Sequence, residues 1–200
     1  SGSYLVRPKD FTPFTAVCDM DTNGGGWTVI QRRRDNKTDF NQTWNTYKDG
    51  FGTQNGNFWI GNNKIHQMTK HEEMVVRFDI EDFLGNKIYA EYDNFTVLDE
   101  NNGYQLFFGT YNGTAGDNLR KHYGMKFATR DRDNDKSCSS KYHGGWWYNH
   151  CHRMNINGLY LQEGEHNINK SEGMSWYSGA ATENFFLLKT TEMKIRPKTH

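Results

Sequence analysis

The strongest constraint on the fold of this chain is a short segment that combines alternating aspartates, two cysteines and a run of aromatic residues. Aspartates occupy positions 131, 133 and 135, and Cys138 and Cys151 bracket a loop that includes Gly-Gly-Trp-Trp-Tyr at 144–148. Carboxylates at every second position suit a hard cation that prefers oxygen ligands, such as calcium. We therefore expect the functional part of the chain to lie in this segment. We also expect at least one of Trp146 and Trp147 to pack in the core.

Length and charge narrow the class of protein. The 200 residues are enough for one domain with a substantial core. The 24 basic and 24 acidic residues give a net charge of zero, which argues against a nucleic-acid or anionic-membrane partner. No apolar run approaches the roughly 18–20 residues that span a bilayer. Because the chain starts at Ser1 rather than at a methionine, we expect a mature fragment or an expressed domain.

Five Asn-x-Ser/Thr sequons indicate an extracellular, secreted glycoprotein. The predicted acceptors are Asn36, Asn41, Asn94, Asn112 and Asn169. The alternative is that these sequons are chance matches, because the chain is rich in asparagine.

The three cysteines give one pair and one remainder. In a secreted chain, Cys138 and Cys151 form the natural disulfide because they close a short loop, which contributes about 3 kcal/mol of stability. Cys18 then needs a partner outside the chain, or it is a free thiol.

The hydrophobic pattern predicts an α+β fold with a central antiparallel sheet and an irregular C-terminal lobe. Strands are expected at 27–32, 74–80, Lys87–Val97, 103–111 and 185–196. Helical spacing links Phe40, Trp44, Tyr47 and Phe51, and 62–68 is long enough for two turns. Because the last hundred residues are mostly loop, we expect the metal and the disulfide to hold that lobe together.

The order of these motifs along the chain resembles the fibrinogen C-terminal (fibrinogen-like) domain. The matching segments are Cys18-Asp-Met-Asp21, Gly24-Gly-Gly-Trp-Thr-Val-Ile-Gln-Arg-Arg33, Phe58-Trp-Ile-Gly61, Tyr111-Asn-Gly-Thr-Ala-Gly-Asp117, Asp131-Arg-Asp-Asn-Asp135, Gly144-Gly-Trp-Trp-Tyr148, Asn155-Ile-Asn-Gly158 and Glu192-Met-Lys-Ile-Arg-Pro197. The resemblance implies one domain over 1–200. Its parts would be an N-terminal subdomain at about 1–30, a central sheet at about 31–101 and a calcium- and ligand-binding lobe at about 102–200, whose last strand returns to the sheet. It also implies that Cys18 pairs with a cysteine upstream of this chain.

The acidic segment is not an EF-hand. Counted from Asp131, the sixth and twelfth positions hold Lys136 and Tyr142, where that loop needs Gly and Glu. The resemblance instead implies a calcium ion held by the carboxylates of Asp133 and Asp135 and by the backbone carbonyl of Ser137. The alternative is a solvated acidic turn that neighbouring basic residues balance.

The histidines around Cys151 also match a zinc cluster or a thiol nucleophile, formed by His143, His150, Cys151 and His152. Either site needs Cys151 as a thiolate, and the expected disulfide removes that thiolate. No nucleophile, base and oxyanion-stabilising group stand together at recognisable positions, so we do not expect an enzyme.

The resemblance to lectin-type members, such as ficolins and tachylectins, implies a ligand pocket beside this disulfide. A cis peptide at His150–Cys151 would direct the N–H groups of Cys151 and His152 at an acetyl carbonyl, while Tyr142 and His152 occupy pocket positions. Lys170 and Ser171 stand where those lectins carry a tyrosine and a small neighbour. Lys170 would favour an anionic group on the ligand, and the segment 178–184 also departs from the family pattern.

These features predict a secreted, calcium-stabilised recognition domain of the innate-immune lectin type, which binds carbohydrates or acetylated groups on cell or pathogen surfaces. Useful affinity would need several copies, joined through an oligomerising region outside this chain. The alternative is a protein-binding module, as in angiopoietin-like or tenascin-like proteins, with a cell-surface protein as its partner.

Overall fold

The computed structural model describes residues 1–162, 169–178 and 185–198. Its helices are η1 (Thr22–Gly24), α1 (Trp44–Asp49), α2 (Asn62–Thr69), η2 (Glu100–Asn102), η3 (Leu119–His122), α3 (Cys138–Tyr142) and η4 (Lys170–Glu172), where η marks a 3-10 helix. Its strands are β1 (Gly2–Val6), β2 (Phe14–Asp19), β3 (Trp27–Arg33), β4 (Phe51–Gly52), β5 (Phe58–Trp59), β6 (Met74–Asp82), β7 (Lys87–Val97), β8 (Leu106–Phe107), β9 (Tyr111–Gly113), β10 (Met154–Asn155), β11 (Ser175–Tyr177) and β12 (Phe185–Pro197).

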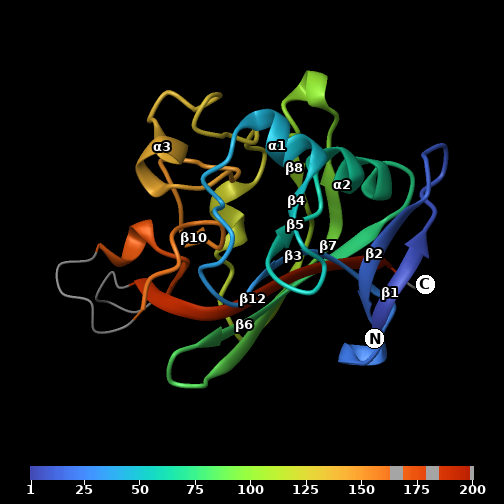
Figure 1. Ribbon diagram of the computed structural model, residues 1–200, viewed down its shortest axis with the longest axis horizontal. Coiled ribbons are helices and arrows are strands. Elements are labelled where there is room, and N and C mark those ends of the chain that lie inside the picture. The colour runs from blue at the N-terminus through green and yellow to red at the C-terminus, as the bar shows by residue number, and fades with distance from the viewer. Residues whose placement is uncertain (163–168, 179–184, 199–200) are drawn as a thin grey trace.

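One large antiparallel sheet organises the molecule, in the strand order β1-β2-β3-β12-β6-β7-β8. The last strand of the chain, β12, lies between β3 and β6, where Ile195 faces Thr28 on one side and Val76 on the other. Figure 1 shows β12 crossing the middle of the sheet, with α1 and α2 on one side of it and α3 in a separate lobe. The α+β fold class is therefore confirmed.

The core forms where the inward faces of these strands meet aromatic side chains from the loops. Val76, Phe78 and Ile80 alternate along β6 and are buried, as the sequence pattern predicts. Trp146 and Trp147 are both fully enclosed, and the ring of Trp147 packs 5.1 Å from that of Phe127. The glycine and tryptophan run at 144–148 is therefore mainly core.

Two expected elements differ from the structure. The helical spacing from Phe40 to Phe51 yields only α1, because the Thr43 side chain caps its start and Gly50, with φ of 99°, ends it. The expected strand at 103–111 is wrong as one element and is divided into β8 and the start of β9. At the break, Asp93 Oδ1 accepts the N–H of Thr110 at 2.6 Å, in addition to backbone hydrogen bonds that join Asp93 to Gly109 and Thr110.

The sequence analysis did not predict the strands at the edge of the sheet. β1 and β2 pair over five residues, and β4 and β5 form a short ladder beside β3. Residues 2–5 of β1 are exposed, so that strand has no alternation of buried and exposed side chains to reveal it. No helix in the described ranges is both long enough and apolar enough to cross a lipid bilayer.

Candidate functional site

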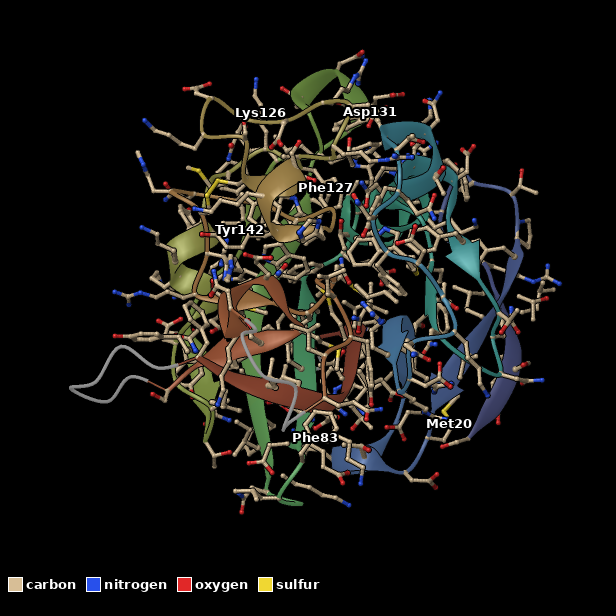
Figure 2. All side chains as sticks on the ribbon, turned by 60° about the vertical axis from the view of Figure 1, so that its left-hand side comes forward. Met20, Phe83, Lys126, Phe127, Asp131 and Tyr142 are labelled. Atoms are coloured by element: carbon tan, nitrogen blue, oxygen red, sulfur yellow. A yellow bond between two sulfur atoms is a disulfide. The ribbon has the colours of Figure 1, made fainter. Side chains whose placement is uncertain are left out.

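The loop that follows α3 is closed by the predicted disulfide between Cys138 and Cys151. Figure 2 shows it as the yellow bond in the lobe that carries Tyr142. The peptide between His150 and Cys151 is cis, as the resemblance implied. Beneath the loop, the buried ring of His122 contacts the carbonyl of Trp147 through Nδ1 at 2.7 Å. Burial lowers the pKa of His122 to about 3, so it is neutral and its Nδ1 donates to that carbonyl.

The acidic turn before the disulfide begins with Asp133, which orients the start of α3. One carboxylate oxygen accepts the N–H groups of Asn134 and Ser139 at 2.9 Å each, and the other accepts that of Ser140 at 2.7 Å. These bonds satisfy backbone donors at the N-terminus of α3, where a negative charge is also favoured by the helix dipole. Asp133 therefore has a structural role that the sequence analysis did not predict.

Asp131, the first of the three aspartates, turns away from the other two. Its Oδ1 accepts the N–H of Trp44 at 2.9 Å and the hydroxyl of Thr129 at 2.8 Å. Burial would raise the pKa of Asp131, but these hydrogen bonds outweigh it and hold the pKa below its usual value. Asp131 thus joins the loop lobe to the first turn of α1.

The carboxylate of Asp135 and the carbonyl of Ser137 provide oxygen atoms of the kind that the predicted calcium site needs. Asp135 is exposed, and its carboxylate makes no hydrogen bond or ion pair within the described residues. Ser137 has a left-handed backbone, with φ of 50°, and its carbonyl accepts only the N–H of Lys141 at 3.0 Å, which leaves one lone pair. Two carboxylates and a carbonyl within five residues are the hard ligands that calcium prefers. Calcium at this turn remains a prediction.

A cluster of rings lies on the other side of the disulfide. The rings of Tyr142 and His152 meet edge to face, with their centroids 4.5 Å apart. Phe185, at the start of β12, packs 5.1 Å from His152, and Tyr148 lies 6.2 Å from it. The amide of Asn155 donates to the carbonyl of Tyr142 at 3.1 Å and so fixes the end of α3 above this cluster. The structure thus brings Tyr142 and His152 together as expected and adds Phe185, which is distant in sequence.

His152 lies in a largely apolar position. Burial lowers its pKa to about 4, although the backbone of Ser171 acts in the opposite direction, so the ring is neutral at physiological pH. Neither ring nitrogen forms a hydrogen bond of good geometry within the described residues. Polar atoms that are buried in this way usually have partners, so the two ring nitrogens of His152 are exceptions in this structure.

The backbone beside the cis peptide offers two further donors. The N–H groups of Cys151 and His152 have no acceptor among the described residues, whereas the neighbouring N–H groups of Asn149 and Arg153 are bonded. Both residues are only half buried. The site therefore presents two adjacent unpaired donors next to an apolar wall, which suits a small group that carries a carbonyl oxygen and a methyl group.

Ser171 and Lys170 lie on η4. The backbone of Ser171 adjoins His152, and the hydroxyl of Ser171 donates to Oδ1 of Asn169 at 2.7 Å. Lys170 is exposed, and no contact joins its side chain to the rings of the cluster within the described ranges. Of the altered segment 178–184, residues 179–184 lie outside the described residues.

The other histidines and Cys18 have separate surroundings. His143 ends α3 and pairs with Glu172 at 3.6 Å, while His150 is exposed. Within the described ranges, no three His, Cys, Asp or Glu side chains come together as a metal site. Cys18 forms no disulfide with a described residue, and it is buried on β2, opposite Gly2 of β1.

The predicted glycosylation sites differ in accessibility. Asn36, Asn94, Asn112 and Asn169 are exposed, whereas Asn41 is half buried. The amide nitrogen of Asn169 donates to Glu172 at 3.2 Å, so a glycan there would alter the start of η4. Glycosylation itself remains a prediction.

Comparisons with known proteins cover nearly the whole chain. The family described as "Fibrinogen beta and gamma chains, C-terminal globular domain" matches residues 1–198. Fibrinogen C domain-containing protein 1 of Xenopus tropicalis is 45% identical over 206 residues, which are 98% of this chain but 44% of that protein. The chain therefore spans less than half the length of this curated relative.

Solved structures give the same result. The fibrinogen-like globe domain of human ANGPTL2 superposes with a TM-score of 0.93 at 36% identity, over 100% of this chain and 93% of that one. Lamprey fibrin D-dimer, in complex with the peptide Gly-His-Arg-Pro-amide, gives a TM-score of 0.87 at 34% identity, over 98% of this chain and 69% of that one.

Proposed function

The chain belongs to the family of fibrinogen C-terminal globular domains, and within that family we propose that it is a secreted recognition domain for acetylated glycans. Fibrinogen-like domains are typically extracellular recognition modules without enzymatic activity, and they bind peptide or protein ligands. The acetylated ligand is the finer proposal. The observation that carries it is the pair of unpaired N–H groups of Cys151 and His152 beside the ring of Tyr142.

The acetyl group would divide its contacts between the two parts of this site. Its carbonyl oxygen accepts hydrogen bonds from the backbone of Cys151 and His152, and its methyl group lies against Tyr142. A single methyl group contributes about 0.8 kcal/mol on burial, so affinity for one site is weak and depends on multiple copies. When bound, calcium would neutralise the carboxylates of Asp133 and Asp135 and thereby fix the turn before α3.

Calorimetry with N-acetylglucosamine tests the proposal, with glucosamine as the ligand that lacks the acetyl group. We expect binding of the first sugar only, reduced in EDTA. Tyr142→Ala should weaken binding by about fourfold, because it removes the apolar wall. The matched control is Tyr4→Ala, which changes an exposed tyrosine on β1 and should leave binding unchanged. Failure to bind any acetylated ligand, with calcium or without it, refutes the acetyl site.

The likeness to the angiopoietin-like globe of ANGPTL2 fits a second candidate, a protein-binding module. The exposed Lys170 on η4 supports it, because a lysine there suits a charged protein surface better than an acetyl group. Binding to a cell surface that persists in saturating N-acetylglucosamine and survives Tyr142→Ala would favour this candidate over the glycan.

A further inference from the structure

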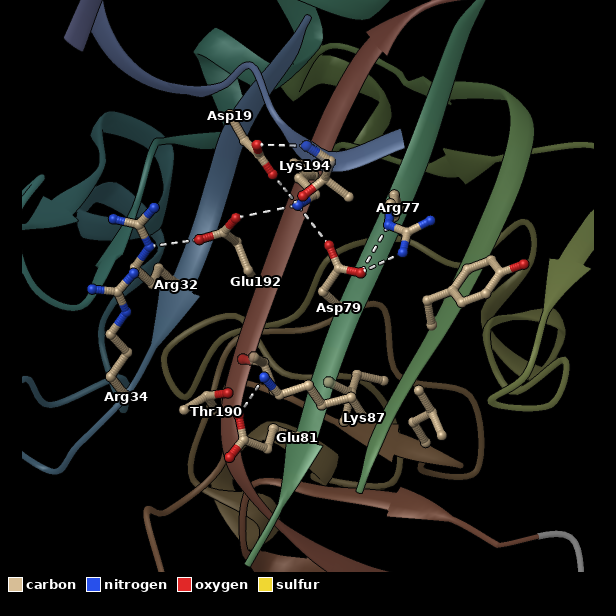
Figure 3. Close-up of a pocket in the computed structure, with 15 residues that line it drawn as sticks. Asp19, Arg32, Arg34, Arg77, Asp79, Glu81, Lys87, Thr190, Glu192 and Lys194 are labelled. Carbon is tan, nitrogen blue, oxygen red and sulfur yellow. Dashed lines mark hydrogen bonds and ion pairs between the residues drawn. The ribbon is translucent and has the colours of Figure 1, made fainter. Parts of the chain in front are cut away.

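A second concave surface lies on the sheet itself, away from the disulfide lobe. It is a groove of about 580 Å³ that crosses β12 between β3 on one side and β6 and β7 on the other. Figure 3 shows Arg32 and Arg34 on one wall, Thr190 and Glu81 at the lower end and Lys194 on the floor. None of the residues of the calcium turn or of the ring cluster lines this groove.

The floor of the groove is a closed network of charges. Lys194 is enclosed, and its ammonium group lies 2.6 Å from Asp19, 2.5 Å from Asp79 and 3.4 Å from Glu192. Arg77 completes the network by pairing with Asp79 at 2.7 Å. Asp19 and Asp79 are paired with cations of the floor, whereas Glu192 pairs both with Lys194 and with Arg32 of the wall.

The wall formed by β3 and the residue after it carries two arginines, of which Arg32 is partly paired and Arg34 is not paired with any described residue. Arg32 uses Nε for Glu192 at 2.7 Å and Nη1 for the carbonyl of Gln54 at 3.2 Å, which leaves Nη2 without a partner. The guanidinium of Arg34 forms no ion pair or hydrogen bond in the described part of the chain. The two guanidinium groups lie beside one another in Figure 3, with Arg34 directly after the end of β3 at Arg33. The free Nη2 of Arg32 and the unpaired guanidinium of Arg34 together form a fork of donors that matches a carboxylate or another planar anion.

Hydrogen bonds to the backbone of Arg34 hold this residue in place in the absence of a ligand. The N–H of Arg34 donates to Asn57 Oδ1 at 2.7 Å, and its carbonyl accepts the hydroxyl of Tyr160 at 3.1 Å. At the opposite wall, Lys87 lies 4.0 Å from Glu81 and is mostly exposed. An anion in the groove would therefore meet positive charge from both walls.

An exposed apolar side chain next to the groove favours a peptide over a sugar. Leu84 does not line the groove, but it is 80% exposed in the turn between Glu81 and Lys87, which both do. The ring face of Tyr89 is covered by the guanidinium of Arg77 at 4.2 Å, so this tyrosine is not a stacking platform for a sugar ring. We propose that the groove binds an acidic peptide segment of a partner protein, whose carboxylate is held by Arg32 and Arg34 and whose apolar side chain contacts Leu84. This surface is independent of the acetyl site.

Fluorescence anisotropy with a fluorescein-labelled, amidated peptide of alternating Glu and Leu tests this proposal. The peptide has no acetyl group, so it does not probe the ring cluster. Arg34→Glu should weaken binding by about tenfold or more, because it replaces a charge-assisted contact with repulsion. Arg7→Glu is the matched control, since it makes the same change of charge at an exposed arginine outside the groove.

Further measurements distinguish the peptide proposal from the alternatives. Tyr142→Ala and saturating N-acetylglucosamine should leave peptide binding unchanged, so the groove and the acetyl site succeed or fail separately. A heparin oligosaccharide that binds more tightly than the peptide and is lost in Arg34→Glu would assign the groove to sulfated glycans and overturn the peptide proposal. The absence of peptide binding, or equal losses in Arg34→Glu and Arg7→Glu with both variants folded by circular dichroism, also overturns it.

Discussion

Replacing Lys194 with methionine tests whether the charge network on the sheet stabilises the fold. The ammonium group is 2% exposed and lies within 3.4 Å of three carboxylates. Removing one partner of a buried ion pair costs about 3–5 kcal/mol, because the other charges lose their compensation. Here the carboxylates of Asp19, Asp79 and Glu192 are 14–32% exposed, so water replaces part of the lost interaction. We therefore expect the free energy of unfolding to fall by about 3 kcal/mol, at the lower end of that range.

The loss in free energy of unfolding that Lys194→Met causes should depend on pH. Burial would raise the pKa of Asp19, but hydrogen bonds from Lys194 and Thr22 outweigh it and hold the pKa far below its usual value. A depressed carboxylate pKa contributes stability above the unfolded-state pKa of about 3.9, and this stability is lost as the pH falls through the folded-state value. The difference between the wild type and Lys194→Met should therefore narrow below about pH 4.

Urea denaturation measures both quantities, with Lys189→Met as the matched control. Lys189 is on the same strand, but it is 49% exposed and its pair with Glu81, at 3.2 Å, is a surface pair worth about 0–1 kcal/mol. A loss below about 1 kcal/mol for Lys194→Met near neutral pH would refute the reasoning. So would a loss that does not change as the carboxylates are protonated.

Three further outcomes follow from the disulfide lobe. Replacing both Cys138 and Cys151 with serine should lower the free energy of unfolding in urea by about 3 kcal/mol, since the bond closes a short loop; an unchanged midpoint would contradict this. Burial lowers the pKa of His122 to about 3, so the unfolded chain takes up the proton first and the free energy of unfolding falls as the pH drops below about 6.5. His122→Gln should flatten this dependence of stability on pH, and equal slopes for the variant and the wild type would argue against it. Calcium should raise the Tm of the wild type but not of Asp135→Asn, while the two have equal Tm in EDTA; a calcium shift that persists in the variant would exclude Asp135 as a ligand.

Strands with strong local patterns were predictable from the sequence. Lys87–Val97 has the expected bounds, and β3, β6 and β12 differ from expectation by one or two residues at one end. Their apolar side chains alternate or run continuously, so the signal is local. β1 gave no such signal, because it is held by its ladder to β2 and exposes its side chains. β1 forms through its tertiary pairing with β2, which a short stretch of sequence does not reveal.

The candidate site likewise contains residues that the sequence predicts and residues that it does not. Tyr142, His152 and the disulfide lie within fifteen positions of one another, and their arrangement follows from the resemblance. Phe185 is 33 positions beyond His152 and reaches it only because β12 returns to the sheet. Asp131 was grouped with its neighbours by spacing alone, although its partners are Trp44 and Thr129. Hydrogen bonds between distant segments gave these side chains roles that spacing could not reveal.

The position of β12 has a consequence for synthesis of the chain. The strand between β3 and β6 follows both of them in the chain, so it leaves the ribosome after them. Until β12 emerges, β3 and β6 each lack a partner along one edge, and such unpaired edges promote aggregation. A truncation that removes β12 would therefore leave the middle of the sheet open, rather than shorten one end.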